Sequence, residues 1–70
     1  MAIIITSDED RAALTALIEA NRAELARLRR IVQLHRDVLN SPADMVASLE
    51  AQAIKSAQAV EWLEEQRAAH

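Results

Sequence analysis

The stretch LTALIEANRAELARLRRIVQLHRDVL, residues 14–39, decides the fold of this chain. Its regularly spaced positions alternate steps of four and three residues, which places them on one face of a long α-helix that packs against other helices. This seam consists of Leu14, Ile18, Asn21, Leu25, Leu28, Val32, His35 and Leu39. Three further apolar side chains widen the seam on one flank: Leu17, Ile31 and Val38.

The composition favours one small helical domain that spans residues 1–70. The chain has no glycine, one proline and no cysteine, and 51% of its residues are hydrophobic, which is typical of a helix former. Without cysteine, neither a disulfide nor a thiolate metal site can compensate for a small core. Stability then depends on long, regular helix packing or on self-association.

Start and stop signals divide the chain into two helices, at about residues 8–39 and 42–67. The first helix is expected to end at Asn-Ser-Pro, residues 40–42, because the residue before proline avoids the α region and asparagine tolerates a left-handed conformation. Ser41 is expected to cap the second helix. A connection this short between two long helices predicts an antiparallel hairpin.

The N-terminal residues 1–6 are expected to form an apolar arm. Ile3, Ile4 and Ile5 precede any helix signal, and three consecutive isoleucines left in water would be a liability. The start of the first helix has two alternative capping boxes: Thr6 with Glu9, or Ser7 with Asp10. The acidic first turn suits the positive end of the helix dipole.

The width of the first helix's apolar band predicts a homodimer. A two-helix hairpin covers only one side of each helix, and this band is broader than a single narrow partner would bury. Each uncovered leucine or isoleucine forfeits roughly 1.5–3 kcal/mol. We therefore expect an all-α fold in which two hairpins dimerise into a four-helix bundle.

Five arginines of the first helix form a basic surface and are candidate partner-binding residues. Arg22, Arg29 and Arg36 form one stripe at seven-residue intervals, and Arg27 and Arg30 lie on the adjoining outer face. Functionally, such a surface grips an acidic patch on a protein or nucleic-acid phosphates. The structural alternative is internal pairing with acidic residues of the second helix, and it is the favoured one. The acidic candidates there are Glu50, Glu61, Glu64 and Glu65.

Four other residues stand out against the helical pattern. Ile54 and Trp62 fall away from the core face of the second helix, so they are candidates for contact with a partner, with a second subunit or with the N-terminal apolar arm. Asn21 and His35 interrupt the apolar seam two heptads apart. Buried polar residues at such positions fix helix register and oligomeric state, and this interpretation is favoured over a polar or pH-sensitive site.

The layout of two long helices joined by a tight turn resembles the Rop-like hairpin regulators of plasmid and phage type, over about residues 8–67. The resemblance is architectural and includes no motif. It implies a dimeric four-helix bundle and a small regulator that binds RNA or inhibits a host protein, such as a transcription regulator. Fold alone does not fix function, so these are expectations.

The sequence favours a homodimeric protein-interaction module, with another protein as its partner. The alternatives are an RNA- or DNA-binding hairpin that uses the arginine stripe, and a purely structural assembly protein. The net charge of −3 counts against nonspecific nucleic-acid binding. We expect no catalytic residues, small-molecule substrate, cofactor or metal. No apolar run is long enough to span a bilayer, so a cytoplasmic protein is expected, in a bacterial host if phage or plasmid encoded.

Overall fold

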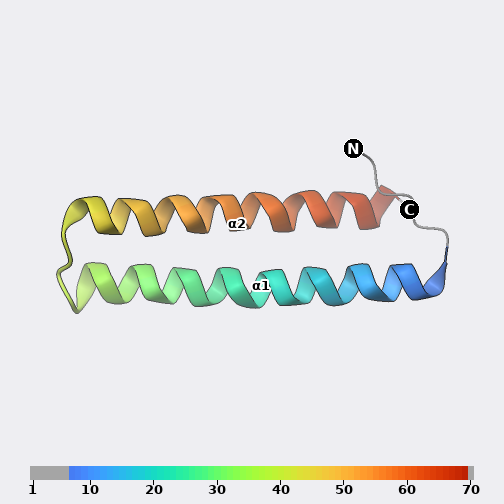
Figure 1. The fold of residues 1–70 in the computed structure, drawn as a ribbon, viewed down its shortest axis with the longest axis horizontal. Helices are drawn as coiled ribbons and strands as arrows, with labels where there is room; N and C mark the ends of the chain where they lie inside the picture. Colours follow the sequence, from blue (N-terminus) through green and yellow to red (C-terminus); the bar gives the residue numbers. More distant parts are fainter. Residues whose placement is uncertain (1–6, 70) are drawn as a thin grey trace.

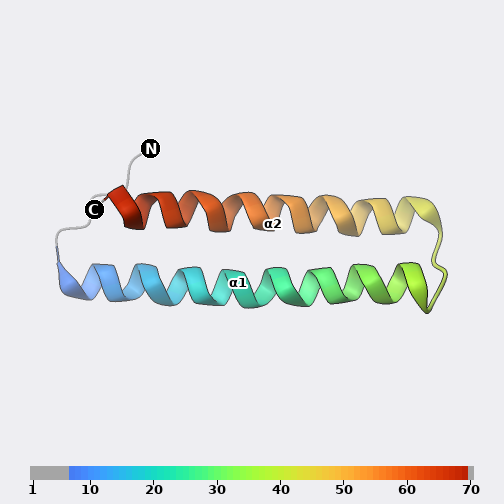
Figure 2. The ribbon, with the colours of Figure 1, turned by 180° about the vertical axis from the view of Figure 1, so that it is seen from behind.

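The protein is an antiparallel helical hairpin, seen here in a computed structural model that describes residues 7–69 (Figure 1). Helix α1 covers Asp8–Asp37 and helix α2 covers Ala43–Ala69. The view from behind shows the same two helices side by side with a short connection at one end (Figure 2). This confirms the predicted all-α hairpin. The apolar arm expected at residues 1–6 lies outside the described residues.

Helix α1 begins at the second of the two predicted capping boxes. Ser7 has extended backbone angles, and its side chain accepts a hydrogen bond from the backbone N–H of Asp10 at 3.1 Å. The first turn is acidic, with Asp8, Glu9 and Asp10 at the positive end of the helix dipole. These features fix the start of α1 one residue after Ser7.

The turn follows the predicted stop signal, but α1 ends two residues earlier than expected. The backbone N–H groups of Val38 and Leu39 both donate to the carbonyl of Leu34, and the second of these bonds spans five residues, which widens the last turn. Asn40 then adopts a left-handed conformation with φ of 50°. Asparagine tolerates this conformation better than most residues, so the chain reverses there.

Helix α2 begins one residue later than the sequence indicated. The carbonyl of Pro42 accepts the N–H of Val46, so Pro42 occupies the capping position expected of Ser41. The hydroxyl of Ser41 instead lies 2.8 Å from Nδ1 of His35. At its other end, α2 continues to Ala69, two residues beyond the predicted boundary.

The core is a narrow line of side chains between the two helices. The buried apolar residues among those described are Leu14, Ile18, Leu25, Leu28, Val32, Val60 and Leu63. Of the residues in the described range, only Ile18 is completely buried, in a cluster with Leu14 and Leu63. The radius of gyration is 15.4 Å, whereas a globular domain of this length has about 11 Å. The hairpin is therefore a single elongated layer with two broad sides.

Candidate functional site

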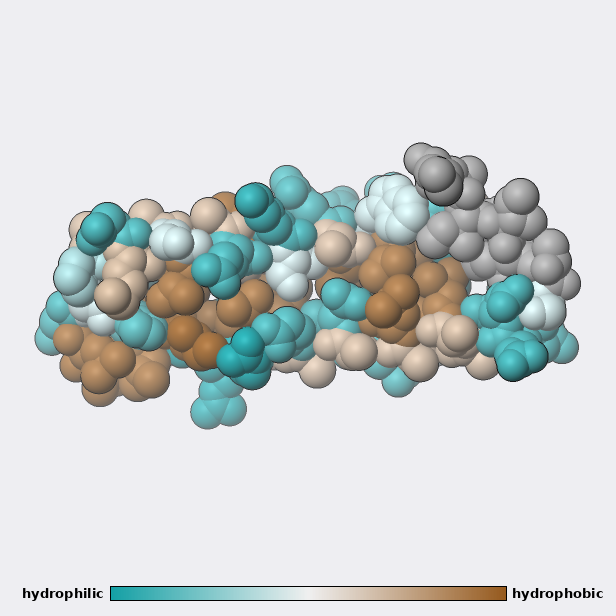
Figure 3. Space-filling view, in the orientation of Figure 1, coloured by the Kyte–Doolittle hydropathy of each residue, from teal (hydrophilic) through white to brown (hydrophobic). Residues whose placement is uncertain are grey.

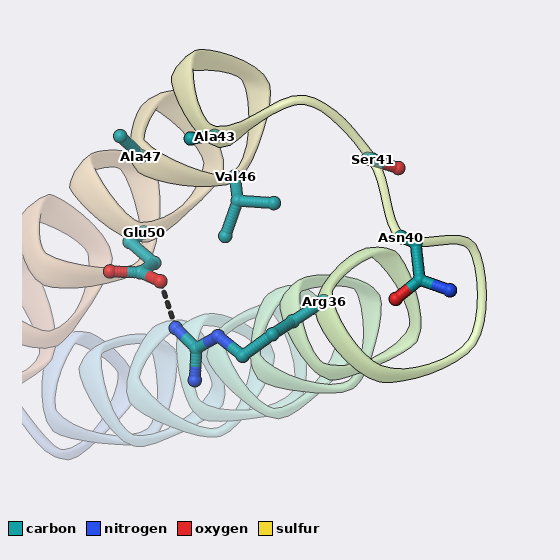
Figure 4. Close-up of a pocket in the computed structure, with 7 residues that line it drawn as sticks. All are labelled: Arg36, Asn40, Ser41, Ala43, Val46, Ala47 and Glu50. Atoms are coloured by element: carbon teal, nitrogen blue, oxygen red, sulfur yellow. Dashed lines mark hydrogen bonds and ion pairs between the residues drawn. The ribbon is translucent and has the colours of Figure 1, made fainter.

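One broad side of the hairpin, here called the charged side, is closed by ion pairs between the helices. Arg22 Nε donates to Glu64 Oε1 at 2.9 Å, and Arg36 pairs with Glu50 near the turn (Figure 4). Both arginines belong to the predicted stripe, and both carboxylates were among its four predicted partners. The internal pairing favoured from the sequence is therefore present at two of the three stripe positions.

Arg29, the middle residue of the stripe, has no such partner among the residues that the structure describes. The paired carboxylates stand fourteen residues apart on α2, and the residue midway between them is Ala57. Within residues 7–69, Arg29 makes no hydrogen bond or ion pair. It borders a shallow groove of about 260 Å³, here called the Arg29 groove, lined by Arg29, Val32, Glu50, Ala53 and Ile54. A basic group without a carboxylate therefore lies beside apolar surface.

The other two candidate arginines lie on the outer face of α1. Arg27 pairs with Glu24 one turn earlier, with nitrogen–oxygen distances of 2.9 and 2.6 Å. The hydrogen bond lowers the pKa of Glu24 and raises that of Arg27. Arg30 makes no ion pair within the described chain. Arg27 and Arg30 border an outer groove of about 500 Å³ that also includes Ile31, Leu34 and Val38.

The opposite broad side, here called the open side, carries exposed apolar side chains together with one ion pair of α1, Glu24 with Arg27. Helical geometry places Leu17, Ile31 and Val38 of α1 on this side, across the seam from the arginine stripe. Helix α2 contributes Met45 and the small or uncharged residues Ser48, Gln52 and Ala59. Leu17 is 49% exposed, Val38 68% and Met45 47%. In the space-filling view, apolar surface gathers on the end of α1 beside the turn (Figure 3).

The two polar residues of the seam, Asn21 and His35, have hydrogen-bond partners nearby in the sequence. Asn21 is half-buried, and its amide donates to the backbone carbonyl of Leu17 at 2.8 Å, within the same helix. His35 is also half-buried and contacts Ser41 in the turn. A hollow of about 510 Å³ lies at this end, lined by Arg36, Asn40, Ser41, Ala43, Val46, Ala47 and Glu50 (Figure 4). The suggested role of Asn21 and His35 in fixing helix register stays a prediction.

The two outlying residues of α2 lie in different places. Ile54 is 59% exposed and lines the Arg29 groove, so the structure brings it next to an arginine of the predicted set. Trp62 is 42% exposed and does not line that groove. Sequence reasoning missed Ala53 and Val32 as the other apolar walls, because both occupy core positions of their helices.

Within residues 7–69, no three histidine or acidic side chains gather as a metal site would require. Neither α1 nor α2 has the length and hydropathy to cross a membrane. Comparison with protein-family models, curated proteins and solved structures gives no match to this chain. The functional argument therefore rests on the two broad sides of the hairpin.

Proposed function

We propose that the protein is a homodimeric interaction module, in which two hairpins pack through their open sides into a four-helix bundle and bind another protein. The observation that carries this proposal is the exposure of Leu17, Val38 and Met45 on the side of the hairpin away from the Arg22–Glu64 and Arg36–Glu50 pairs. Large apolar groups gathered on one face are typical of an interaction site. A second hairpin supplies a matching apolar layer.

Energetics favour the open side over the charged side as the dimer contact. Fully burying a large apolar side chain contributes about 1.5–3 kcal/mol, so a half-exposed residue gains about half of that. Packing on the charged side would desolvate two ion pairs, Arg22–Glu64 and Arg36–Glu50, whereas the open side carries one, Glu24–Arg27. Burying ion pairs often costs more than their attraction returns. A second copy therefore gains most on the open side.

The charged side then stays available for a different protein. Arg29 and Ile54 both lie outside the open side, and arginine and exposed apolar residues are frequent anchors at interfaces. Three of the five candidate arginines already pair with carboxylates, which weakens the alternative of phosphate binding. A small regulator that inhibits a protein such as a transcription regulator fits this arrangement and the resemblance to Rop-like hairpins.

Sedimentation equilibrium tests the dimer. Across micromolar concentrations, the expected mass is twice the 7.8 kDa of one chain, whereas a constant single-chain mass would refute the dimer.

Partner binding is tested separately by affinity capture from the native cell. The unsubstituted protein is compared with the double variant Arg29→Ala, Ile54→Ser. A bound protein that the variant loses, while its helix content and dimer mass are unchanged, supports the interaction module. Selective capture of RNA or DNA supports the alternative.

A further inference from the structure

We infer that the Arg29 groove is a docking site for an acidic segment of a partner protein. A glutamate or aspartate of that segment binds the Arg29 guanidinium, and a neighbouring apolar side chain packs on Val32, Ala53 and Ile54. This inference rests on the proposed function as an interaction module and names the chemistry of the partner.

The first argument is an interruption in the row of ion pairs. Arg22, Arg29 and Arg36 recur every seven residues, and the first and last of them each bond a carboxylate of α2. At a rise of about 1.5 Å per residue, Arg29 lies about 10 Å along the helix from each. Ala57 stands where a third carboxylate would complete the row. A carboxylate from a partner can make the bidentate bond that Ala57 cannot.

The second argument is the shape of the groove. Ala53 leaves the floor low, and Ile54 forms an exposed apolar wall beside it. Its volume of about 260 Å³ is below the usual range of about 300–1,000 Å³ for small-molecule and cofactor sites. The groove therefore fits one or two side chains of another protein better than a whole ligand.

The third argument is the local balance of charge. Glu50 also lines the groove, but its carboxylate is paired with Arg36. The uncompensated group is the Arg29 cation, which selects a negative partner. A nucleic acid needs several free cations in a row, whereas the arginines on either side of Arg29 in the stripe are neutralised by Glu64 and Glu50. A single acidic side chain next to an apolar one matches the site better.

An NMR titration tests this docking site on the whole protein. The probe is an alanine-based helical peptide that carries glutamate and leucine four residues apart, and the matched probe has glutamine in place of glutamate. The Nε–H resonance of Arg29 reports on its carboxylate bond. We expect the glutamate peptide to shift this resonance and to bind about tenfold more tightly than the glutamine peptide.

Three substitutions distinguish binding at the Arg29 groove from general attraction of an acidic peptide to positive charge. Arg29→Ala is expected to weaken binding of the glutamate peptide by about tenfold or more. Ala57→Glu should weaken it similarly, because the new carboxylate pairs with Arg29 from within the fold while the hairpin stays intact. Arg30→Ala is the matched control, since it removes an equally unpaired arginine outside the groove, and it should change affinity by less than about twofold.

Several outcomes overturn the inference. They are equal affinity for the two peptides, equal losses with Arg29→Ala and Arg30→Ala, or no shift of the Arg29 resonance at saturating peptide. Displacement of the peptide by a short RNA or DNA oligonucleotide, with steep salt dependence, would assign the surface to nucleic acid instead. Sedimentation of the same variants keeps the two proposals distinct, because loss of peptide binding by an intact dimer concerns the groove alone.

Discussion

Replacing Leu17 by glutamate separates the stability of the hairpin from that of the proposed dimer. Leu17 lies within α1 on the open side and is 49% exposed in the single chain. Glutamate has nearly the same intrinsic helix propensity as leucine, so the helix itself should persist. The isolated hairpin loses only the buried half of one leucine, about 1 kcal/mol.

The dimer should lose far more free energy of association, because its two-fold symmetry places the substitution at two positions of the interface. Lost apolar burial accounts for about 2 kcal/mol over the two copies. Each new carboxylate must also leave water at the interface, which costs at least a further 1 kcal/mol or so per group. The total is on the order of 4 kcal/mol, and it raises the dissociation constant by about a thousandfold.

Sedimentation equilibrium of Leu17→Glu, beside circular dichroism, measures both consequences. The control is Ala23→Glu, which adds the same charge to an exposed position on the outward face of α1. We expect Leu17→Glu to sediment as a helical single chain at concentrations where Ala23→Glu and the unsubstituted protein are dimers. A dimer of unchanged dissociation constant in Leu17→Glu would refute the assignment of the open side.

Three further predictions concern the turn and the exposed ion pairs. Asn40→Ala should destabilise the hairpin by about 1 kcal/mol in thermal unfolding, because alanine disfavours the left-handed conformation that Asn40 adopts, whereas Asn40→Gly should not. A double-mutant cycle of Arg36→Ala and Glu50→Ala should give a coupling energy of at most about 1 kcal/mol, since both side chains are partly exposed; a larger coupling contradicts this. The pKa of Glu24 is lowered by Arg27, so the stability it contributes is present above its usual pKa and is lost as pH falls through the lowered one. Carbon NMR titration of Glu24 should therefore show its midpoint rise in Arg27→Gln, and an unchanged midpoint would contradict this assignment.

The fold was predictable because its signals are local. The four-and-three spacing from Leu14 to Val32 specifies one helical face, and the structure buries the apolar residues of that spacing. Asn40 before Ser41 and Pro42 marks the reversal, since Asn40 takes the left-handed conformation that asparagine tolerates and the residue before proline avoids the right-handed α region. Each signal acts within a few residues and needs no knowledge of the partner helix.

The pairing of charges was less predictable, because it depends on how far α2 slides along α1. Glu50 and Glu64 pair with the stripe, but Glu61 and Glu65 were equal candidates from sequence. Their order along the chain does not reveal the register. The sequence shows that residue 57 is alanine and not a carboxylate. Only the register of the two helices shows that Ala57 lies between the two ion pairs, beside Arg29.

The position of Ile54 illustrates the same limit. A helical wheel shows that Ile54 and Trp62 leave the core face, but it does not say which broad side each one approaches. That depends on the crossing of the two helices and on the turn, where Ser41 contacts His35 and α2 starts after Pro42. The structure assigns Ile54 to the Arg29 groove, which separates it from Trp62 as a candidate contact.

The two broad sides together determine how the proposed dimer would engage a partner. In that proposed dimer the second copy would cover the open side, so the charged sides of both hairpins would face outward and the bundle would carry two Arg29 grooves related by two-fold symmetry. A partner that is itself a symmetric dimer can occupy both grooves, and the second contact then forms at high effective concentration. A modest affinity at each groove is thereby multiplied without any new contact. Leu17→Glu dissociates the proposed dimer and so separates the two grooves without altering either one. It should therefore leave the affinity of a single acidic peptide unchanged and lower only the affinity of a dimeric partner.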